Sequence, residues 1–381
     1  MSKLLEDILV LDFSQFLSGP YASLRLSDMG ARVIKIERPV IGDICRTLYV
    51  SDVKIDGAES TIFHAINRNK ESFVADIKDE DELEKIKKLI KKTDILIHNF
   101  RPGVMQRVGL GYEAVKEINP AVIYAEISGY GDKGEWKGFP GQDLLLQSVS
   151  GIAYLSGNEA DQPTPMGVAA GDILAGTHLV QGILAALFSR FNSGEGSLVQ
   201  VSMLESLLDF QFEVLTCFLN DGYALPERSA VNNGHAYIAA PYGIYQTADG
   251  YIALAMGSIT LLGQLLQCDL LYKYNDPTEW FDKRDEIKLI LKAHLLTKKT
   301  KEWLHILEPA DIWCSDVFDY DTLLKSDGYN VLDMEQMVYS GNKNIKTTRC
   351  PVRVDGEALK SDKGAPALGQ DTLMIGKEFG L

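Results

Sequence analysis

Cysteine is scarce in this 381-residue sequence, and the cysteines present are not paired in motifs. There are five, an odd number, and none forms a CxxC pair. A disulfide framework or a zinc site built on paired cysteines is therefore excluded as the organising feature. The pattern is typical of reduced thiols in a cytoplasmic protein. The cysteines are Cys45, Cys217, Cys268, Cys314 and Cys350.

Several common catalytic motifs are also missing. The sequence contains no GxSxG elbow, no HExxH pair and no GxxxxGK[ST] loop. These absences argue against an α/β-type serine hydrolase, a zinc protease of the HExxH class and a P-loop enzyme. We expect no metal centre.

Positive charge and long hydrophobic runs are both limited. The formal net charge of −15 argues against nucleic acid or an anionic membrane as the main partner. The longest apolar stretch, near residues 179–188, contains Gln181 and is shorter than the roughly 20 residues of a membrane span. The acidic start MSKLLEDILVLDF has no signal-peptide pattern. We expect a soluble cytoplasmic protein that binds neither nucleic acid nor membrane.

Alternating β and α segments dominate the first half of the chain. This order predicts an α/β fold, with a parallel sheet covered by helices on both faces. The fold is Rossmann-like, although no GxGxxG follows the first strand. A polar loop is expected over residues 39–60. Strands are predicted at 8–13, 32–37, 72–76, 95–98 and 122–126, with helices between them, such as the charged helix at 79–92.

A second domain is indicated by the loss of regular hydrophobic periodicity near Asp221. Residues 221–242 lack periodicity and carry Pro226 and Pro241, as a linker does. Residues 243–258 predict a β-hairpin, and helical segments follow. From residue 347 to the end, the sequence predicts strands and loops. We predict a large domain, 1–220 completed by 330–381, a small α+β domain, 225–325, and linkers near 221–242 and 320–335.

The segment MGVAAGDILAGTH places Asp172 among small residues where an apolar helix is expected over 172–191. Two interpretations are open on this segment alone. Asp172 caps the helix, or it is a functional carboxylate with space for a bulky ligand beside it. The capping interpretation is the simpler one here.

Basic side chains recur close to the predicted strand ends. A single arginine or lysine is usually a solvated surface charge. Several at one edge of an acidic protein suggest a phosphate-bearing ligand. The candidates are Arg38, Lys70, Lys78, Arg101 and Arg107.

Taken together, a series of motifs resembles the class III CoA-transferase family (CaiB/BaiF type), which includes formyl-CoA transferase and carnitine CoA-transferase. The motifs are LDFSQFLSGPYASLRLSDMGARVIKIERP, NRNKES, HNFRPGVMQRVGLGYE, ISGYGDKGEW, AAGD and YQTADGYIALAMG, which span nearly the whole chain. The family also contains alpha-methylacyl-CoA racemases. The resemblance implies coenzyme A or an acyl-CoA as one substrate, a small carboxylic acid as the other, and an interlocked homodimer.

The resemblance also implies roles for individual residues. Asp172 is the nucleophile that forms aspartyl anhydride and aspartyl-CoA thioester intermediates. Asp143 matches a second acidic residue that positions or polarises the reacting carbonyl, with helix capping as an equal alternative. The implied CoA contacts are Leu17, Ser18, Arg38, Ala75, Lys78, Asn99, Phe100, Arg101 and Arg107.

Two departures from formyl-CoA transferase bear on the substrates. That enzyme has a glutamine where this chain has Leu17, and its glycine-rich loop has only a rough match in AMGS, residues 255–258. Both argue against formate and oxalate as substrates.

Two other functions are alternatives to CoA transfer. Racemases of the family use the histidine of a GHD motif, whereas this chain has Gly141-Gln142-Asp143. Glutamine cannot exchange a proton at neutral pH, and His178 is interpreted as a helix-face residue rather than a substitute base. An acyl-CoA-binding protein without turnover is the non-enzymatic alternative. Asp172 among its small neighbours argues against it.

Overall fold

A computed structural model describes residues 4–48, 54–55 and 59–381. The loop predicted over 39–60 therefore lies partly outside the described residues. The chain divides into two compact units, which are treated separately here. Unit 1 comprises Met1–Leu146, Ala169–Leu207 and Leu332–Leu381, and unit 2 comprises Gln147–Val168 and Leu208–Val331. The predicted domain bounds stay a prediction.

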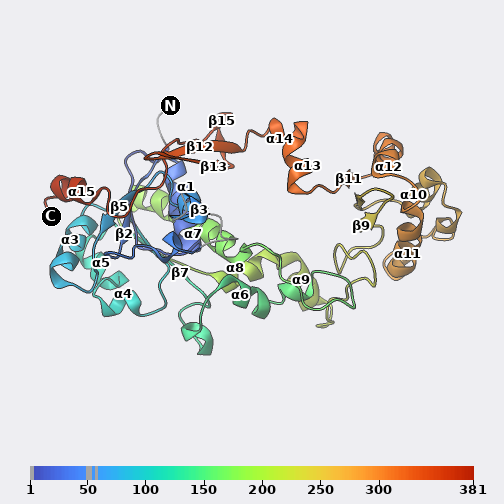
Figure 1. Cartoon of the computed structure of the whole chain (residues 1–381). Helices are drawn as coiled ribbons and strands as arrows, with labels where there is room; N and C mark the ends of the chain where they lie inside the picture. Colours follow the sequence, from blue (N-terminus) through green and yellow to red (C-terminus); the bar gives the residue numbers. More distant parts are fainter. Residues whose placement is uncertain (1–3, 49–53, 56–58) are drawn as a thin grey trace. The chain divides into compact units, whose positions relative to one another are not determined.

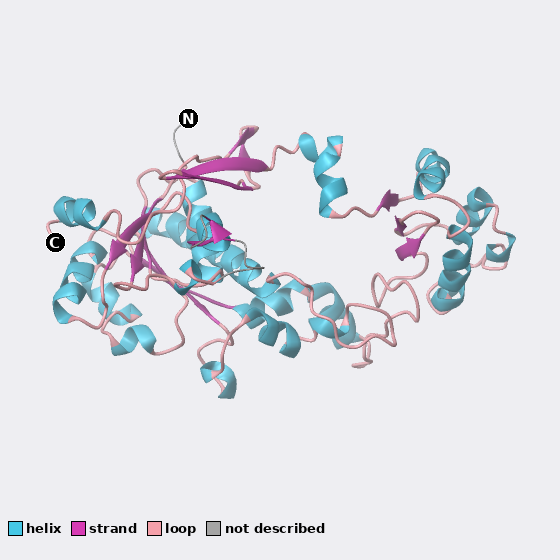
Figure 2. Cartoon of the chain, viewed as in Figure 1, coloured by secondary structure: helices cyan, strands magenta, loops and turns pink. Residues whose placement is uncertain are grey.

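Unit 1 is built on a six-stranded parallel sheet (Figures 1 and 2). The strand order is β5-β2-β1-β6-β7-β8, so the direction of winding reverses between β1 and β6. This is the order of a doubly wound dinucleotide-binding sheet. The predicted parallel α/β fold is confirmed. The strands are β1 Leu9–Asp12, β2 Arg32–Glu37, β5 Glu71–Val74, β6 Ile95–His98, β7 Ile123–Ser128 and β8 Leu198–Ser202.

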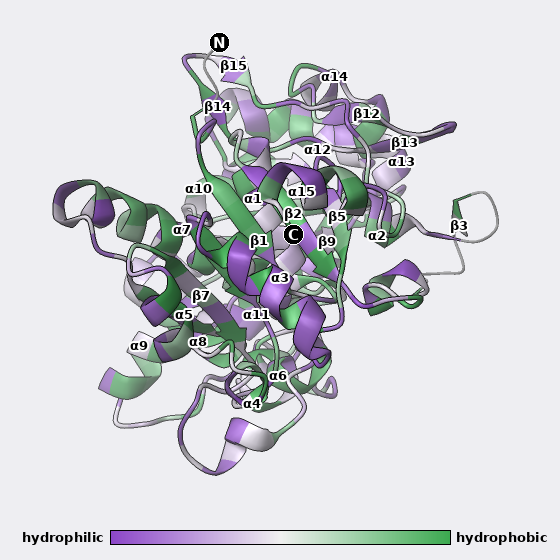
Figure 3. Ribbon diagram, turned by 90° about the vertical axis from the view of Figure 1, so that its left-hand side faces the viewer, coloured by the Kyte–Doolittle hydropathy of each residue, from purple (hydrophilic) through white to green (hydrophobic). Residues whose placement is uncertain are grey.

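Helices cover both faces of this sheet. On one side α1 Ser18–Asp28 packs against α7 Ala170–Ser193, and α7 also contacts β7 and β8. On the other, α3 Glu80–Ile90 and α5 Tyr112–Ile118 contribute Ile86 and Val115 to a core shared with strand residues. A strand covered on both faces is mostly apolar, which explains the green segments of the sheet in Figure 3, although β2 also buries Lys35 and Glu37.

The C-terminal helix α15, Thr372–Phe379, corrects the prediction of strand and loop to the end of the chain. Ile375 is fully buried in the sheet core, whereas Leu373 and Met374 are exposed. One buried position in a short helix gives no readable periodicity, so tertiary packing decides the conformation.

The remaining elements of unit 1 are short. They include the antiparallel pairs β3–β4, β12–β13 and β14–β15. Their bounds are β3 Lys54–Ile55, β4 Glu59–Ser60, α2 Thr61–Ile66, α4 Val104–Arg107, α6 Asp143–Val149, α8 Met203–Phe210, β12 Glu335–Ser340, β13 Lys343–Thr348, β14 Arg353–Val354 and β15 Glu357–Ala358. Helices α6 and α8 each begin in unit 1 and end in unit 2.

Unit 2 has its own core around a three-stranded antiparallel sheet of order β11-β10-β9. The predicted hairpin is confirmed as β9 and β10. Tyr245 and Trp303 are fully buried in this core. The elements are α9 Phe212–Asn220, β9 Gly243–Gln246, β10 Tyr251–Leu254, α10 Ile259–Leu266, α11 Arg284–Leu295, α12 Thr300–Leu307, β11 Cys314–Asp316, α13 Tyr320–Lys325 and α14 Asp327–Asn330.

Helix α7 is longer than the apolar stretch seen in the sequence. It has 24 residues and is apolar enough, by length and composition alone, to cross a membrane. A core helix passes the same test, and α7 buries Leu179 and Ile183 while packing on α1 and the sheet. This packing explains the buried residues of α7, whereas Phe188 and Phe191 on the same helix are exposed.

Candidate active site

The carboxyl ends of β1 and β6 meet at the point where the strand order reverses. The loop after β1, residues 14–18, is joined there to Asn99, the first residue after β6. The Asn99 Oδ1 accepts from the Gln15 amide at 2.8 Å, and its Nδ2 donates to the Gln15 carbonyl at 2.7 Å. Ligands of doubly wound sheets bind at such a switch point.

Asp172 lies in the first turn of α7, as the third residue of the helix. The N-cap is Ala169, which has no side-chain capping bond, so the prediction that Asp172 caps the helix is wrong. Its carboxylate instead lies near Ser18, whose hydroxyl and backbone amide favour the ionised form. Ser18 is the first residue of α1, which places Asp172 beside the carboxyl end of β1.

Asp143 approaches the same helix end from α6. Its Oδ1 accepts from the amides of Gly171 at 2.7 Å and Asp172 at 3.3 Å. The first amides of a helix have no partner within the helix, so an anionic acceptor is favourable there. Asp143 therefore caps α7 and fixes the backbone that carries the Asp172 side chain. Its predicted action on a substrate carbonyl stays a prediction.

Two glycines of α7 allow this close assembly. A Cβ at Gly171 would lie 3.1 Å from the Asp143 Oδ1, and one at Gly176 would lie 2.7 Å from the Ser18 carbonyl oxygen. The sequence suggested that these small residues leave space for a ligand. It also suggested close packing at the helix start, and the structure shows that packing at Gly171 and Gly176. The space for a ligand stays a prediction.

The electrostatic surroundings of Asp172 leave it more basic than an ordinary aspartate. Burial is the main cause that raises its pKa from 3.8 to about 6, and the charge of Asp143 adds to the effect. The hydrogen bonds from Ser18 act in the opposite direction. At pH 7 the Asp172 carboxylate is thus mostly ionised, and its raised pKa makes it a better nucleophile than an exposed carboxylate.

The residues implied as CoA contacts lie along the carboxyl edge of the parallel sheet. Leu17 and Ser18 follow β1, Arg38 follows β2, Ala75 follows β5, and residues 99–101 follow β6. The side chains of Arg38, Lys78, Arg101 and Arg107 are exposed. Within the described ranges, none of these four has an ion-pair partner. Their binding roles stay predictions.

Three other predicted ligand contacts already have hydrogen-bond or ion-pair partners within the protein. Lys70 is fully buried, with its Nζ 3.0 Å from the Asp12 Oδ2, so its prediction as a phosphate contact is corrected. The Ala75 amide donates to the Glu37 carbonyl at 2.9 Å, which leaves only the Ala75 carbonyl for a ligand. The Asn99 side-chain amide is used by Gln15, as described above, and also donates to the Ser18 hydroxyl at 3.3 Å.

A cavity of about 720 Å³ opens beside β6, β7 and β8. Its lining includes Phe100 and Arg101, two of the implied CoA contacts, and the His98–Glu126 pair. Asp172 is not among the lining residues. In the part of the chain that the structure describes, no cluster of three or more His, Cys, Asp or Glu residues is placed to hold a metal ion.

The positions relevant to racemisation hold no free base. Gln142 precedes α6 and uses its carbonyl to accept from the Leu145 and Leu146 amides. His178 has its Nδ1 3.0 Å from the Ser206 hydroxyl, which in turn donates to the Ser202 carbonyl. His178 therefore faces α8, in agreement with its interpretation as a helix-face residue.

Comparison with known proteins identifies the family. The model of CoA-transferase family III matches residues 5–372. The chain belongs to this family. An acetyl-CoA:oxalate CoA-transferase of Acetobacter aceti is 32% identical and aligns over 98% of this chain and 95% of its own length.

Two further comparisons agree with this assignment. The human succinyl-CoA:glutarate CoA-transferase is 31% identical to this family member, over 99% of this chain and 86% of its own. A crystal structure of a CAIB/BAIF family protein from Brucella suis matches with a TM-score of 0.83 and 26% identity, covering 98% of each chain.

Sequence reasoning did not find that Ser18 meets Asp172, or that Asp143 binds the start of α7. Both contacts join segments that are distant in the chain. The glycines of α7, Gly171 and Gly176, were the available signal, because glycine within a helix allows a neighbouring segment to pack closely.

We expect Asp172→Asn to raise the free energy of unfolding near pH 7.5. The folded state holds the Asp172 proton more tightly than the unfolded chain, so this group's contribution to stability falls as the pH rises from about 4 to about 6. A neutral amide removes that loss, worth about 1–3 kcal/mol at roughly 1.4 kcal/mol per pKa unit. Urea unfolding of both proteins measures it. The difference should shrink near pH 4, and an equal difference at both pH values would contradict the assignment.

Proposed function

We propose that this protein transfers CoA from an acyl-CoA donor to a carboxylic acid through covalent intermediates on Asp172. The observation that carries the proposal is the state of this carboxylate. It is held at the sheet's switch point by Ser18, remains ionised at neutral pH, and has a pKa raised to about 6. Membership of CoA-transferase family III supports the reaction class.

The first half-reaction loads CoA onto the enzyme. The Asp172 carboxylate attacks the thioester carbonyl of the donor, the C–S bond breaks, and a mixed anhydride and CoA thiolate result. The thiolate then attacks the aspartyl carbonyl, the anhydride C–O bond breaks, and the donor acid leaves as its carboxylate. An aspartyl-CoA thioester remains.

The second half-reaction runs in reverse with the acceptor. The acceptor carboxylate attacks the aspartyl thioester and releases CoA thiolate, which forms a second mixed anhydride. The thiolate attacks the acceptor's acyl carbonyl, and the new acyl-CoA leaves as the Asp172 carboxylate is regenerated. No proton or external cofactor is consumed in either half. Ser18, which donates to the Asp172 carboxylate at rest, is placed to stabilise negative oxygen in each addition step.

We propose a short acyl-CoA as donor and a dicarboxylate as acceptor. The support is that the relatives described above are named for acetyl-CoA with oxalate and for succinyl-CoA with glutarate. Apolar Leu17, in place of the glutamine of formyl-CoA transferase, favours an acceptor longer than oxalate. Racemisation is less well supported, because Gln142 offers no exchangeable base.

We expect Asp172→Ala to lower CoA transfer by about 10³-fold or more, as for removal of a covalent nucleophile. The assay pairs succinyl-CoA or acetyl-CoA with a panel of dicarboxylic, hydroxy and short-chain acids. Hydroxylamine should trap an Asp172 hydroxamate in the parent protein. The control is Glu195→Ala, an exposed carboxylate just beyond the same helix.

Two results would refute the transferase proposal. One is full transfer activity in Asp172→Ala. The other is deuterium uptake at the alpha carbon of the acyl group with no exchange of CoA between acids, which would indicate a racemase. Binding of acyl-CoA with neither reaction would indicate a binding protein.

We expect Arg38→Ala and Arg107→Ala each to raise the KM for the acyl-CoA about tenfold with little change in kcat. A charge-assisted bond to phosphate, worth about 1.5–3 kcal/mol, holds ground state and transition state alike. Steady-state kinetics measures the effect, and Lys377→Ala on α15 is the control for loss of an exposed cation. An unchanged KM in both variants would remove these residues from the CoA site.

We propose that the protein is a homodimer in the cytoplasm. Helix α7 supports an interface, since Phe188 is 75% and Phe191 is 89% exposed. Sedimentation equilibrium should give twice the 42.2 kDa chain mass. Changing both phenylalanines to aspartate should shift the protein toward monomer, whereas Leu373→Asp, at a side chain that is 90% exposed on α15, should not. A monomeric parent protein would contradict the proposal. The interlocked topology stays a prediction.

A further inference from the structure

The loop between β1 and α1 has a backbone conformation that its own residues do not favour. Phe16 has φ of +65°, in the left-handed region that is costly for an aromatic residue. Its side chain is 42% exposed, so burial of the ring contributes little to holding the loop. Contacts from outside residues 14–18 must therefore maintain this shape.

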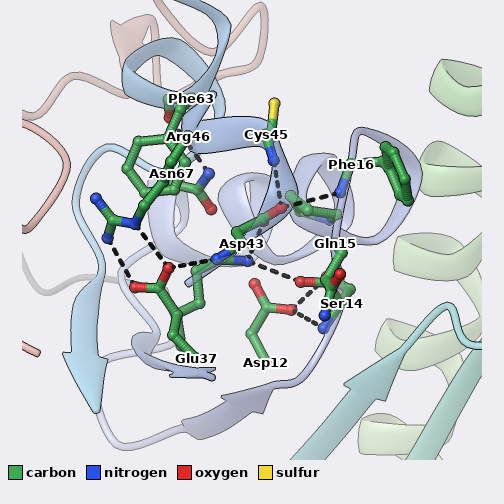
Figure 4. A network of polar contacts seen from close by, with 12 residues as sticks. Asp12, Ser14, Gln15, Phe16, Glu37, Asp43, Cys45, Arg46, Phe63 and Asn67 are labelled. Atoms are coloured by element: carbon green, nitrogen blue, oxygen red, sulfur yellow. Dashed lines mark hydrogen bonds and ion pairs between the residues drawn. The ribbon is translucent and has the colours of Figure 1, made fainter. Parts of the chain in front are cut away.

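A buried ion pair supplies two of those contacts (Figure 4). The Asp43 Oδ1 accepts from the Phe16 amide at 3.3 Å. The Asp43 Oδ2 lies 2.8 Å from the Lys35 Nζ, which also donates to the Ser14 carbonyl at 2.7 Å. Lys35 and Asp43 are 0% and 2% exposed. The pair thus holds the loop at both Ser14 and Phe16.

Two further charged residues, Glu37 and Arg46, hold the Lys35–Asp43 pair in position. The Asp43 amide donates to the Glu37 Oε1 at 2.9 Å, and Arg46 binds both oxygens of Glu37 at 2.8 and 2.7 Å. Burial alone would lower the pKa of Lys35, but Asp43, Asp12 and Glu37 together hold it above its ordinary value. Lys35 therefore stays charged, and Asp43 has no freedom to turn away from the loop.

The same loop ends at the nucleophile. Ser18 opens α1, and its carbonyl oxygen would lie 2.7 Å from a Cβ at Gly176, so Ser18 sits against the first turns of α7. From there its hydroxyl and amide favour the ionised Asp172 carboxylate. The other charged group facing Asp172 is Asp143, from α6, which destabilises its ionised form. Ser18 from α1 is thus the group that favours the charged state, and its position depends on the path of residues 14–17.

We propose that Lys35 and Asp43 are positioning residues for the nucleophile, which hold the loop 14–18 so that Ser18 stabilises the ionised Asp172 carboxylate. The inference rests on the proposed function, because it gives the network a task only if Asp172 is the nucleophile. Neither Lys35 nor Asp43 needs to touch a substrate, since both act through the backbone of Ser14 and Phe16.

The test compares Asp43→Ala with a matched buried pair. Asp28 and Arg68 also form an ion pair, with both side chains 1% exposed, at the opposite end of α1 from Ser18. We expect Asp43→Ala to lower kcat about 10- to 100-fold, as small displacements of reacting groups do. In the pH profile of kcat/KM, the acidic limb, where activity rises as Asp172 loses its proton, should shift to higher pH by about one unit. The KM for acyl-CoA should stay within threefold of the parent value. Asp28→Ala should lower the thermal midpoint and leave the limb in place.

A double-mutant cycle tests the route from Asp43 to Asp172. Ser18→Ala should move the limb in the same direction as Asp43→Ala but by less, because the residue 18 amide remains. The double variant should move it by less than the sum of the two single shifts, since the hydroxyl contribution is lost in both. Asp43→Asn keeps an acceptor for the Phe16 amide and should give a smaller shift. If Asp43→Ala fails to fold, Asp43→Asn takes its place in the cycle.

Three outcomes would overturn the inference. These are an unmoved limb in the Asp43 variants, a limb shift equal to that of Asp28→Ala, or additive shifts for Asp43 and Ser18. The proposed function would survive each of them, because it is decided by Asp172→Ala and by hydroxylamine trapping. Retained activity in Asp172→Ala would instead refute the proposed function, whatever the Asp43 variants show.

Discussion

The contact between the starts of α1 and α7 is the constraint on which the site depends. The Ser18 carbonyl lies so close to Gly176 that any side chain there would collide with it. This approach brings Ser18 near Asp172, where its hydroxyl and amide favour the ionised carboxylate. The sheet order fixes where the contact falls, since α1 leaves β1 at the switch point with β6. The sheet order and the packing of α1 on α7 therefore together determine the position of Asp172.

Two carboxylates share this helix end, and their repulsion has a chemical consequence. Asp143 satisfies amides at the start of α7 while its charge helps to raise the Asp172 pKa to about 6. An acceptor acid is itself an anion, so the resting site repels it. In the proposed aspartyl-CoA thioester Asp172 carries no charge, so the electrostatic repulsion of an incoming carboxylate is weaker. The order of the proposed half-reactions thus follows from the electrostatics.

Much of the sheet could be predicted from the sequence, whereas its buried charges could not. The strands 32–37 and 95–98 match β2 and β6, because alternation over 32–37 and a continuous apolar run over 95–98 are both strand patterns. Lys35 and Glu37 lie in β2, and both are buried. A charge in a strand covered on both faces needs a partner, and that rule was the signal available.

The candidate site also has features that the sequence could predict and features that it could not. Asp172 was recognisable from its small neighbours and from the family motif, both local in the chain. Its contact with Ser18 and the pairing of Lys70 with Asp12 join distant segments, so no local pattern reveals them. Lys70 was placed among the phosphate contacts for this reason. Sequence spacing locates a residue on an edge of the sheet but does not show whether its charge is already neutralised.

Stability alone gives a poor account of the buried charges around the loop. Replacing a buried ion pair with apolar residues of similar size is often neutral or stabilising, because desolvation offsets most of the attraction. Lys35, Asp43, Glu37 and Arg46 form a connected set of such charges under a loop that carries a strained Phe16. An apolar core could fill this volume, but it could not hydrogen-bond the Phe16 amide or the Ser14 carbonyl. Directional bonds to those two groups are what the charges provide, and they determine where Ser18 meets Asp172.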